Sequence, residues 1–146
     1  WKLIRYINKR SKLPVIVKGV LTLYDAKQAL KHGAKGIWIS NHGGRMLNSG
    51  ISTVEALKKI SQIKKKNKRI ILIADGGVDK GSDIIKYLCL GADMVAIGRA
   101  ALYGLIIDGA DGVNEIINIL NSELYTAMIN GGFRSLRDFT NKRIYE

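Results

Sequence analysis

The sequence predicts an α/β protein with a parallel sheet, because short apolar runs alternate with segments of helical periodicity along its 146 residues. Connections of this kind are right-handed helical crossovers between parallel strands. The runs are almost continuously apolar, which is typical of strands that helices cover. The length is normal for one domain and the apolar content is sufficient for a packed core.

The apolar runs predict strands at residues 14–18, 36–40, 70–74 and 94–97. Helical periodicity is found at residues 23–32, 53–65, 83–90 and 112–131. Asp83 is expected to cap the third of these helices at its N-terminus. Gly33 and Gly91 are expected to end the helices that precede them. Residues 133–146 form a polar tail.

The residues at the carboxyl ends of the strands favour one architecture over another. These residues are Lys18, Ser40-Asn41-His42, Asp75-Gly76-Gly77 and Gly98-Arg99. Alternating strands and helices fit either an open doubly wound sheet or part of a (β/α)₈ barrel. A glycine-rich turn followed at the next strand by Gly-Arg is typical of the phosphate site in the last two loops of a barrel.

We therefore predict that residues 1–146 are the C-terminal half, strands five to eight, of a single (β/α)₈ TIM barrel domain. Half a barrel has two unpaired edges and an exposed inner face. We expect a longer parent chain, or self-association of this part.

Composition excludes some classes of function. The net charge of +12 raises the possibility of nucleic-acid binding. The densest basic run, residues 64–69, lies between a helix and a strand, and no regularly spaced aromatics are available for base stacking. No apolar run reaches the ~18–20 residues that span a membrane. We predict no nucleic-acid partner, no metal site, and a cytoplasmic location, at most peripheral to the inner membrane.

His42 and Arg45 are the candidate reactive residues. His42 follows a strand, and histidine is the most frequent general base near neutral pH. Two glycines after it allow the backbone to pass close to a ligand. Arg45 offers a planar fork suited to a carboxylate. A base and an anion clamp in one loop suit the oxidation of a small hydroxy acid, although a backbone-bonded loop histidine would give the same pattern.

Residues 75–81 and Gly98-Arg99 are a candidate phosphate site. Glycines expose backbone N–H groups, and the following helix adds its positive N-terminal end. Arg99 adds a bidentate donor. Ordinary turns between strands and helices also contain such glycines. Lys18 ends its strand and is expected to point into the mouth of the barrel rather than along its surface.

Taken together, these motifs resemble the FMN-dependent α-hydroxy-acid dehydrogenase and oxidase family, which includes lactate, glycolate and mandelate enzymes and flavocytochrome b2. The resemblance extends from residue 13 to about residue 138. Its most specific motif is Ser40-Asn41-His42-Gly43-Gly44-Arg45, followed by Asp75-Gly76-Gly77-Val78, residues 90–99 and Tyr103-Gly104.

The resemblance implies a role for each matching residue. His42 is the catalytic base, and Arg45 pairs with the substrate carboxylate. Lys18 and Ser40 contact the flavin. The phosphate side of FMN is bound by Asp75, Gly76, Gly77, Val78, Asp79, Gly98 and Arg99.

Two residues depart from the family pattern. An arginine is common where Asp79 stands, and an acidic group is unfavourable beside a phosphate, so Lys80 or the backbone would have to replace that contact. An aspartate that supports the histidine in many members is Asn48 here. With Asn48, the His42 imidazolium lacks that charged partner.

The resemblance implies FMN-dependent oxidation of a small L-2-hydroxy acid to the 2-oxo acid within a complete, oligomeric parent. L-lactate is the expected substrate, with mandelate left open by residues 51–52 and 102–103. The electron acceptor is not indicated. Alternatives are a non-catalytic half-barrel and another phosphate-binding barrel, such as the inosine-monophosphate dehydrogenase type. The latter uses a catalytic cysteine loop, whereas Cys89 lies in a predicted helix.

Overall fold

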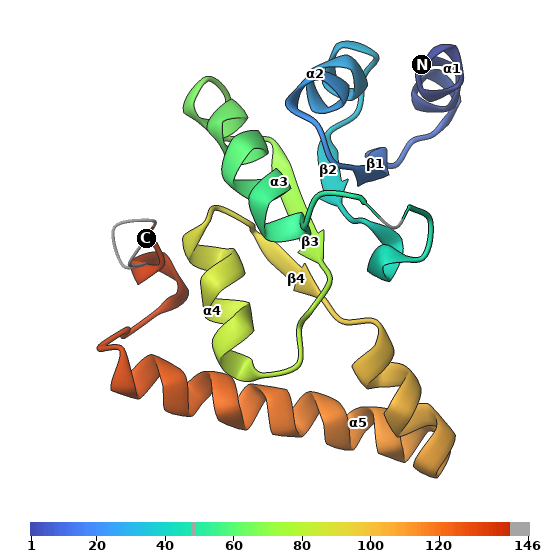
Figure 1. Ribbon diagram of the computed structural model, residues 1–146. Coiled ribbons are helices and arrows are strands. Elements are labelled where there is room, and N and C mark those ends of the chain that lie inside the picture. The colour runs from blue at the N-terminus through green and yellow to red at the C-terminus, as the bar shows by residue number, and fades with distance from the viewer. Residues whose placement is uncertain (48, 141–146) are drawn as a thin grey trace.

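The computed structural model describes residues 1–47 and 49–140, in which four parallel strands form one sheet (Figure 1). The strands are β1 (Ile16–Val20), β2 (Gly36–Ile39), β3 (Ile71–Asp75) and β4 (Met94–Ala96). The α-helices are α1 (Lys2–Arg10), α2 (Leu23–Lys31), α3 (Thr53–Ile60), α4 (Gly81–Cys89) and α5 (Arg99–Asn130). Short 3₁₀ helices are η1 (His42–Gly44), η2 (Ser61–Lys65) and η3 (Leu136–Asp138).

The order of the strands distinguishes the two architectures that the sequence allowed. Each strand pairs in parallel with the next along the chain, so the order is β1-β2-β3-β4 without a reversal. A doubly wound sheet reverses its order and receives helices on both faces. Right-handed crossovers in unbroken order place all helices on one face, and Figure 1 shows α2, α3 and α4 on the same side of the strands. The sheet is therefore a sector of a barrel wall.

The two faces of the sheet differ in burial. Side chains that point towards the helices form the core, and Ile37, Ile39 and Leu72 are completely buried there. On the opposite face, Ile16 and Met94 are 37% and 56% exposed. The face covered by the helices is thus a buried core, whereas the face that would point into a barrel has exposed apolar side chains. No helix in the described ranges is long and apolar enough to cross a membrane.

The N-terminus of α4 corrects one expectation. The helix begins at Gly81, so Asp83 is not its N-cap. The Asp83 carboxylate instead accepts hydrogen bonds from the backbone N–H groups of Asp79 and Lys80, at 3.3 and 3.1 Å. It caps the helix from inside its first turn. The expected stops are confirmed, since Gly33 and Gly91 both have φ of 104° and follow the C-cap residues of α2 and α4.

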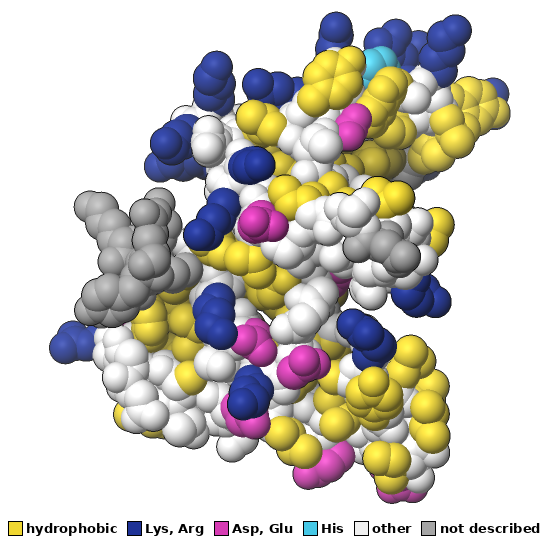
Figure 2. All heavy atoms as spheres, viewed as in Figure 1, with side chains coloured by type: hydrophobic (Ala, Val, Ile, Leu, Met, Phe, Trp, Pro, Cys, Tyr) yellow, Lys and Arg dark blue, Asp and Glu magenta, His cyan; other side chains and the backbone are white. Residues whose placement is uncertain are grey.

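Helix α5 is the second correction, because it begins at Arg99 and not at residue 112. Asp108 and Gly109 have non-helical backbone angles, so α5 bends into two arms there. The arms pack closely at two glycines: a Cβ on Gly104 would lie 2.3 Å from the carbonyl oxygen of Gly112. These glycines interrupt the helical pattern of the sequence, which is why the first arm was not predicted. Figure 2 shows hydrophobic side chains gathered over this bent end of α5.

Candidate active site

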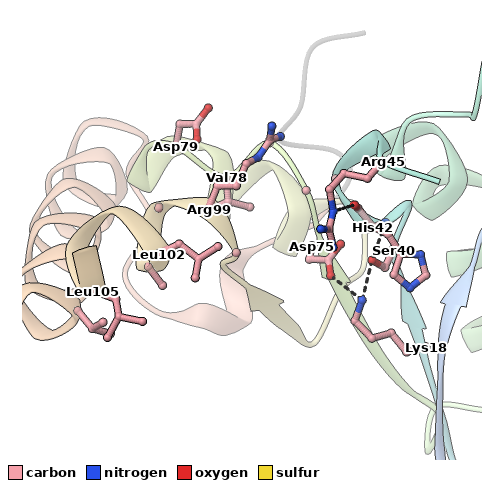
Figure 3. Close-up of a pocket in the computed structure, with 17 residues that line it drawn as sticks. Lys18, Ser40, His42, Arg45, Asp75, Val78, Asp79, Arg99, Leu102 and Leu105 are labelled. Atoms are coloured by element: carbon pink, nitrogen blue, oxygen red, sulfur yellow. Dashed lines mark hydrogen bonds and ion pairs between the residues drawn. The ribbon is translucent and has the colours of Figure 1, made fainter. Parts of the chain in front are cut away.

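A cavity of about 540 Å³ lies at the carboxyl ends of the strands. All the predicted site residues line it: Lys18, Ser40, His42, Arg45, Asp75, Gly76, Gly77, Val78, Asp79, Gly98 and Arg99. Figure 3 shows Lys18, Ser40, His42, Arg45 and Asp75 at one end of the cavity. Arg99 and Asp79 lie towards the other end, with Leu102 and Leu105 of α5. The volume is in the range of small-molecule sites.

Lys18 is held in place by neighbours on two strands. Its Nζ donates a hydrogen bond of 2.9 Å to Oγ of Ser40 and lies 3.4 Å from Oδ2 of Asp75. The same carboxylate oxygen accepts a 3.0 Å hydrogen bond from Nε1 of Trp38, whose ring lies below the ammonium group. Lys18 therefore points into the cavity, as predicted, and presents a fixed positive charge there.

The loop that carries His42 is ordered by short-range contacts. Ser40 is fully buried, and its hydroxyl accepts a 3.2 Å hydrogen bond from the His42 N–H. The Asn41 side chain accepts another from the Gly43 N–H. His42 has φ of 55°, the one positive value among the described residues other than glycine. Strained backbone of this kind clusters at functional sites.

Gly19 makes room for the His42 ring. The register of β1 against β2 shifts between Lys18 and Val20, so Gly19 is the extra residue of a bulge, with φ of 90°. A Cβ on Gly19 would lie 2.8 Å from Cε1 of His42. The glycine thus permits both the conformation of the strand end and the position of the imidazole.

Arg45 stands on the same loop as His42. Its Nε donates to the His42 carbonyl oxygen at 3.4 Å, and the rest of its side chain is exposed to the cavity (Figure 3). A guanidinium group beside an imidazole can bind a carboxylate while the imidazole accepts a proton from the adjacent carbon or oxygen.

The other end of the cavity has the backbone N–H groups and helix N-terminus that favour binding of an anion. Gly76 and Gly77 have φ of 100° and 61°, and both line the cavity. A Cβ on Gly77 or Gly98 would meet no atom within 4 Å and would project into open space. Glycine therefore leaves backbone N–H groups accessible to a ligand at both turns. The N-terminus of α5 at Arg99 adds the positive end of a helix dipole.

The residues that depart from the family pattern, together with their neighbours, lie in different places. Asp79 lines the cavity and is exposed, so an acidic group does stand at the anion end. Lys80 does not replace the missing cation, because it lines a separate hollow between α4 and α5. Val78 forms part of the cavity wall, but its side chain is buried in the core. Asn48 lies outside the described residues.

Two residues that support the site were not predicted. Tyr87 is 2% exposed, and its hydroxyl lies 2.6 Å from both Oγ1 of Thr53 and the carbonyl oxygen of Gly76. Burial raises the pKa of Tyr87, and the nearby Asp75 carboxylate raises it further, so the hydroxyl keeps its proton. The sequence signal was weak, because a tyrosine in an apolar helical run is ordinarily a core residue.

The comparison with known proteins identifies the family. Over residues 1–146, the sequence matches the family described as FMN-dependent dehydrogenase. The chain belongs to this FMN-dependent family. The match covers every residue and confirms the resemblance that the motifs indicated. It disfavours a barrel of the inosine-monophosphate dehydrogenase type, as does Cys89, which is buried on α4.

The curated relatives include 2-hydroxyacid oxidases. The 2-hydroxyacid oxidase of Dictyostelium discoideum is 42% identical over 146 residues, which are 100% of this chain and 37% of that protein. The 2-hydroxyacid oxidase 2 of Mus musculus is 39% identical over 140 residues, or 96% of this chain and 39% of that protein. The chain thus spans about two fifths of the length of the curated relatives it matches.

Solved structures of the family have the same arrangement. A structure named as lactate oxidase from Pediococcus acidilactici matches with a TM-score of 0.90 and 43% identity, over 96% of this chain and 38% of that chain. A flavocytochrome b2 structure matches with a TM-score of 0.92 and 35% identity, over 97% of this chain and 38% of that chain. These proteins are TIM-barrel flavoenzymes, so the four-stranded sheet is part of such a barrel.

Proposed function

We propose that residues 1–146 form the C-terminal half, strands five to eight, of a single barrel domain that oxidises a small L-2-hydroxy acid with FMN. The observation that carries this proposal is the cavity itself, in which a histidine, an arginine, a lysine held by two hydrogen-bonding or charged neighbours, and two glycine turns meet from consecutive strand ends. The remaining strands of the barrel, supplied by the complete protein, would close the open inner face.

FMN fits the two ends of the cavity. The N–H groups of Gly76, Gly77 and Gly98 and the Arg99 side chain would hold the phosphate. A Cβ on Gly77 or Gly98 would meet no atom within 4 Å, so both turns leave space there, although the Asp79 carboxylate lines the same end of the cavity. Lys18, fixed by Ser40 and Asp75, would lie beside the flavin ring and stabilise its negative charge after reduction. When bound, FMN supplies the acceptor for the two electrons that leave the substrate.

The substrate would lie between Arg45 and His42. Arg45 pairs with the carboxylate and thereby fixes the α-carbon against the cofactor. His42 accepts the proton that the substrate loses on oxidation, and such a base contributes roughly 10²–10⁴-fold to the rate. The hydrogen bond from the His42 N–H to the buried Ser40 hydroxyl would help to hold the His42 backbone in place.

L-lactate is the substrate we propose. The supporting observation is the 43% identity to a structure named as lactate oxidase. Other relatives carry the names glycolate oxidase and (S)-mandelate dehydrogenase, at 40% and 34% identity, so glycolate and mandelate are the comparison substrates. For the complete protein we further propose a homo-oligomer, located in the cytoplasm or peripherally at the inner membrane.

The decisive experiment follows the visible absorbance of the flavin in the complete purified protein under anaerobic L-lactate. Bleaching by L-lactate, lost in His42→Gln while FMN is retained, is the expected result. A bound flavin that no 2-hydroxy acid reduces would refute the proposed reaction. A protein without flavin would favour a non-catalytic half-barrel instead.

A further inference from the structure

Tyr87 contacts the proposed phosphate turn without lining the cavity. It lies on α4 with its side chain in the core, 2% exposed, whereas Gly76 and Gly77 line the cavity. Its hydroxyl is 2.6 Å from the carbonyl oxygen of Gly76 and 3.2 Å from that of Asp75. The single hydroxyl proton is thus shared between two successive carbonyl groups at the end of β3, with the shorter contact to Gly76.

The hydrogen-bond pattern has one consistent arrangement of protons. Carbonyl oxygens only accept, so the Tyr87 hydroxyl donates its proton to the turn. The Oγ1 of Thr53, which is 4% exposed, lies 2.6 Å from the Tyr87 hydroxyl and donates to it. Thr53 itself is the first residue of α3. The turn is thus fixed from two helices through a buried hydroxyl pair.

The direction of these carbonyl groups decides where the turn presents its N–H groups. In a planar trans peptide, the N–H points opposite to the preceding carbonyl. With the Asp75 and Gly76 carbonyls held towards α4, the N–H groups of Gly76 and Gly77 point away from α4. Both glycines have positive φ, so the turn has few steric restraints of its own. An external restraint is what keeps these N–H groups aligned.

We propose that Tyr87, supported by Thr53, is a positioning residue that aims the Gly76 and Gly77 N–H groups at the FMN phosphate. The proposal rests on the proposed function, since it assumes that the cavity binds FMN. It assigns to α4 a role in cofactor affinity that is separate from the residues of the cavity wall.

The test compares two ligands that differ by the phosphate alone. The dissociation constants of FMN and riboflavin are measured on the flavin-free complete protein, for the wild type and for Tyr87→Phe. Loss of the restraint should weaken FMN binding about fivefold, the effect of one hydrogen bond, and leave riboflavin binding unchanged. Tyr125→Phe removes an exposed hydroxyl and should change neither constant.

Variants of Thr53 provide a second test of the proposal, which remains available if Tyr87→Phe fails to fold. Thr53→Val should weaken FMN binding in the same phosphate-dependent way, and Thr53→Ser, which keeps the hydroxyl, should restore it. Equal losses for FMN and riboflavin, or no loss for either, would show a merely structural pair and overturn the proposal. If the wild type binds no FMN, the proposed function fails as well, and the two failures are thereby distinguished.

Discussion

His42 combines a reactive side chain with an unfavourable backbone conformation. Its φ of 55° is in the left-handed region, which costs a non-glycine residue about 1–2 kcal/mol. The buried Ser40 hydroxyl and the Asn41 side chain each accept a hydrogen bond from this loop and offset that cost. Gly19 leaves the space that the ring occupies. The position of the proposed base thus depends on neighbours that carry no chemistry themselves.

Gly19→Ala should test whether the position of the His42 ring affects the reaction rate apart from its effect on protein stability. The new Cβ would lie 2.8 Å from Cε1 of His42, so the ring has to move. A displacement of about 1 Å can cost roughly a hundredfold in rate, and we expect a loss of that size in flavin reduction by L-lactate. Stopped-flow absorbance measures it in the complete protein.

Gly132→Ala is the matched control for Gly19→Ala. Gly132 also has positive φ, 67°, but a Cβ there would meet no atom within 4 Å. Both variants should lose about 1 kcal/mol of unfolding free energy, because alanine is strained at positive φ. Unchanged flavin reduction in Gly19→Ala would contradict the proposed steric role.

Helix α4 connects the anion end of the cavity to the core. Its first turn is capped by Asp83, its N-terminal Gly81 N–H donates to Glu123 of α5 at 2.8 Å, and its Tyr87 reaches the β3 turn. Burial opposes ionisation of Asp83. The hydrogen bond from Lys86 and those from the backbone outweigh it, and the pKa of Asp83 lies below its ordinary value of 3.8.

Asp83→Asn should destabilise the complete protein in a pH-dependent way. The folded pKa is lowered, so the carboxylate stabilises the fold above pH 3.8, and this contribution is lost as the pH falls through the folded pKa. We expect the free energy of unfolding to fall by roughly 0.3–1 kcal/mol at pH 7, because asparagine keeps an acceptor but lacks the negative charge at the helix N-terminus, and this difference should shrink below pH 3.8. Urea unfolding across this range measures it. The exposed Glu115→Gln should show no such loss, and a constant difference at all pH values would exclude the carboxylate as its source.

Helices cover one face of the sheet, and the other face is exposed. The helices cover the outer side of the sheet, whereas Ile16 and Met94 are exposed on the inner side. The strands β1 and β4 are both edges, with unpaired backbone groups. In a complete barrel these surfaces would be covered by the other strands.

Residues 1–146 expressed alone should therefore self-associate. Size-exclusion chromatography with light scattering should show oligomers whose fraction rises with concentration, because apolar area and strand edges remain accessible. The double variant Ile16→Lys and Met94→Lys should reduce association, whereas Leu136→Lys, exposed away from the sheet, should not. A wild-type fragment that stays monomeric at every concentration would contradict this prediction.

The sequence by itself determined the strands, the parallel α/β class and the rim residues, because apolar runs and the polar residues after them are local signals. It also pointed to His42, Arg45 and the glycine turns, since residues at the ends of neighbouring parallel strands meet at one edge of the sheet. Their individual roles stay predictions.

Only the tertiary structure decided the rest. The Lys18–Ser40–Asp75 contacts join three strands, and the Tyr87–Thr53 pair joins residues that are 34 positions apart. The first arm of α5 depends on Gly104 meeting Gly112 after the chain reverses. The strand order that places all helices on one face is likewise a property of packing. Such contacts follow from how distant elements fit together in space, and local periodicity carries no information about that fit.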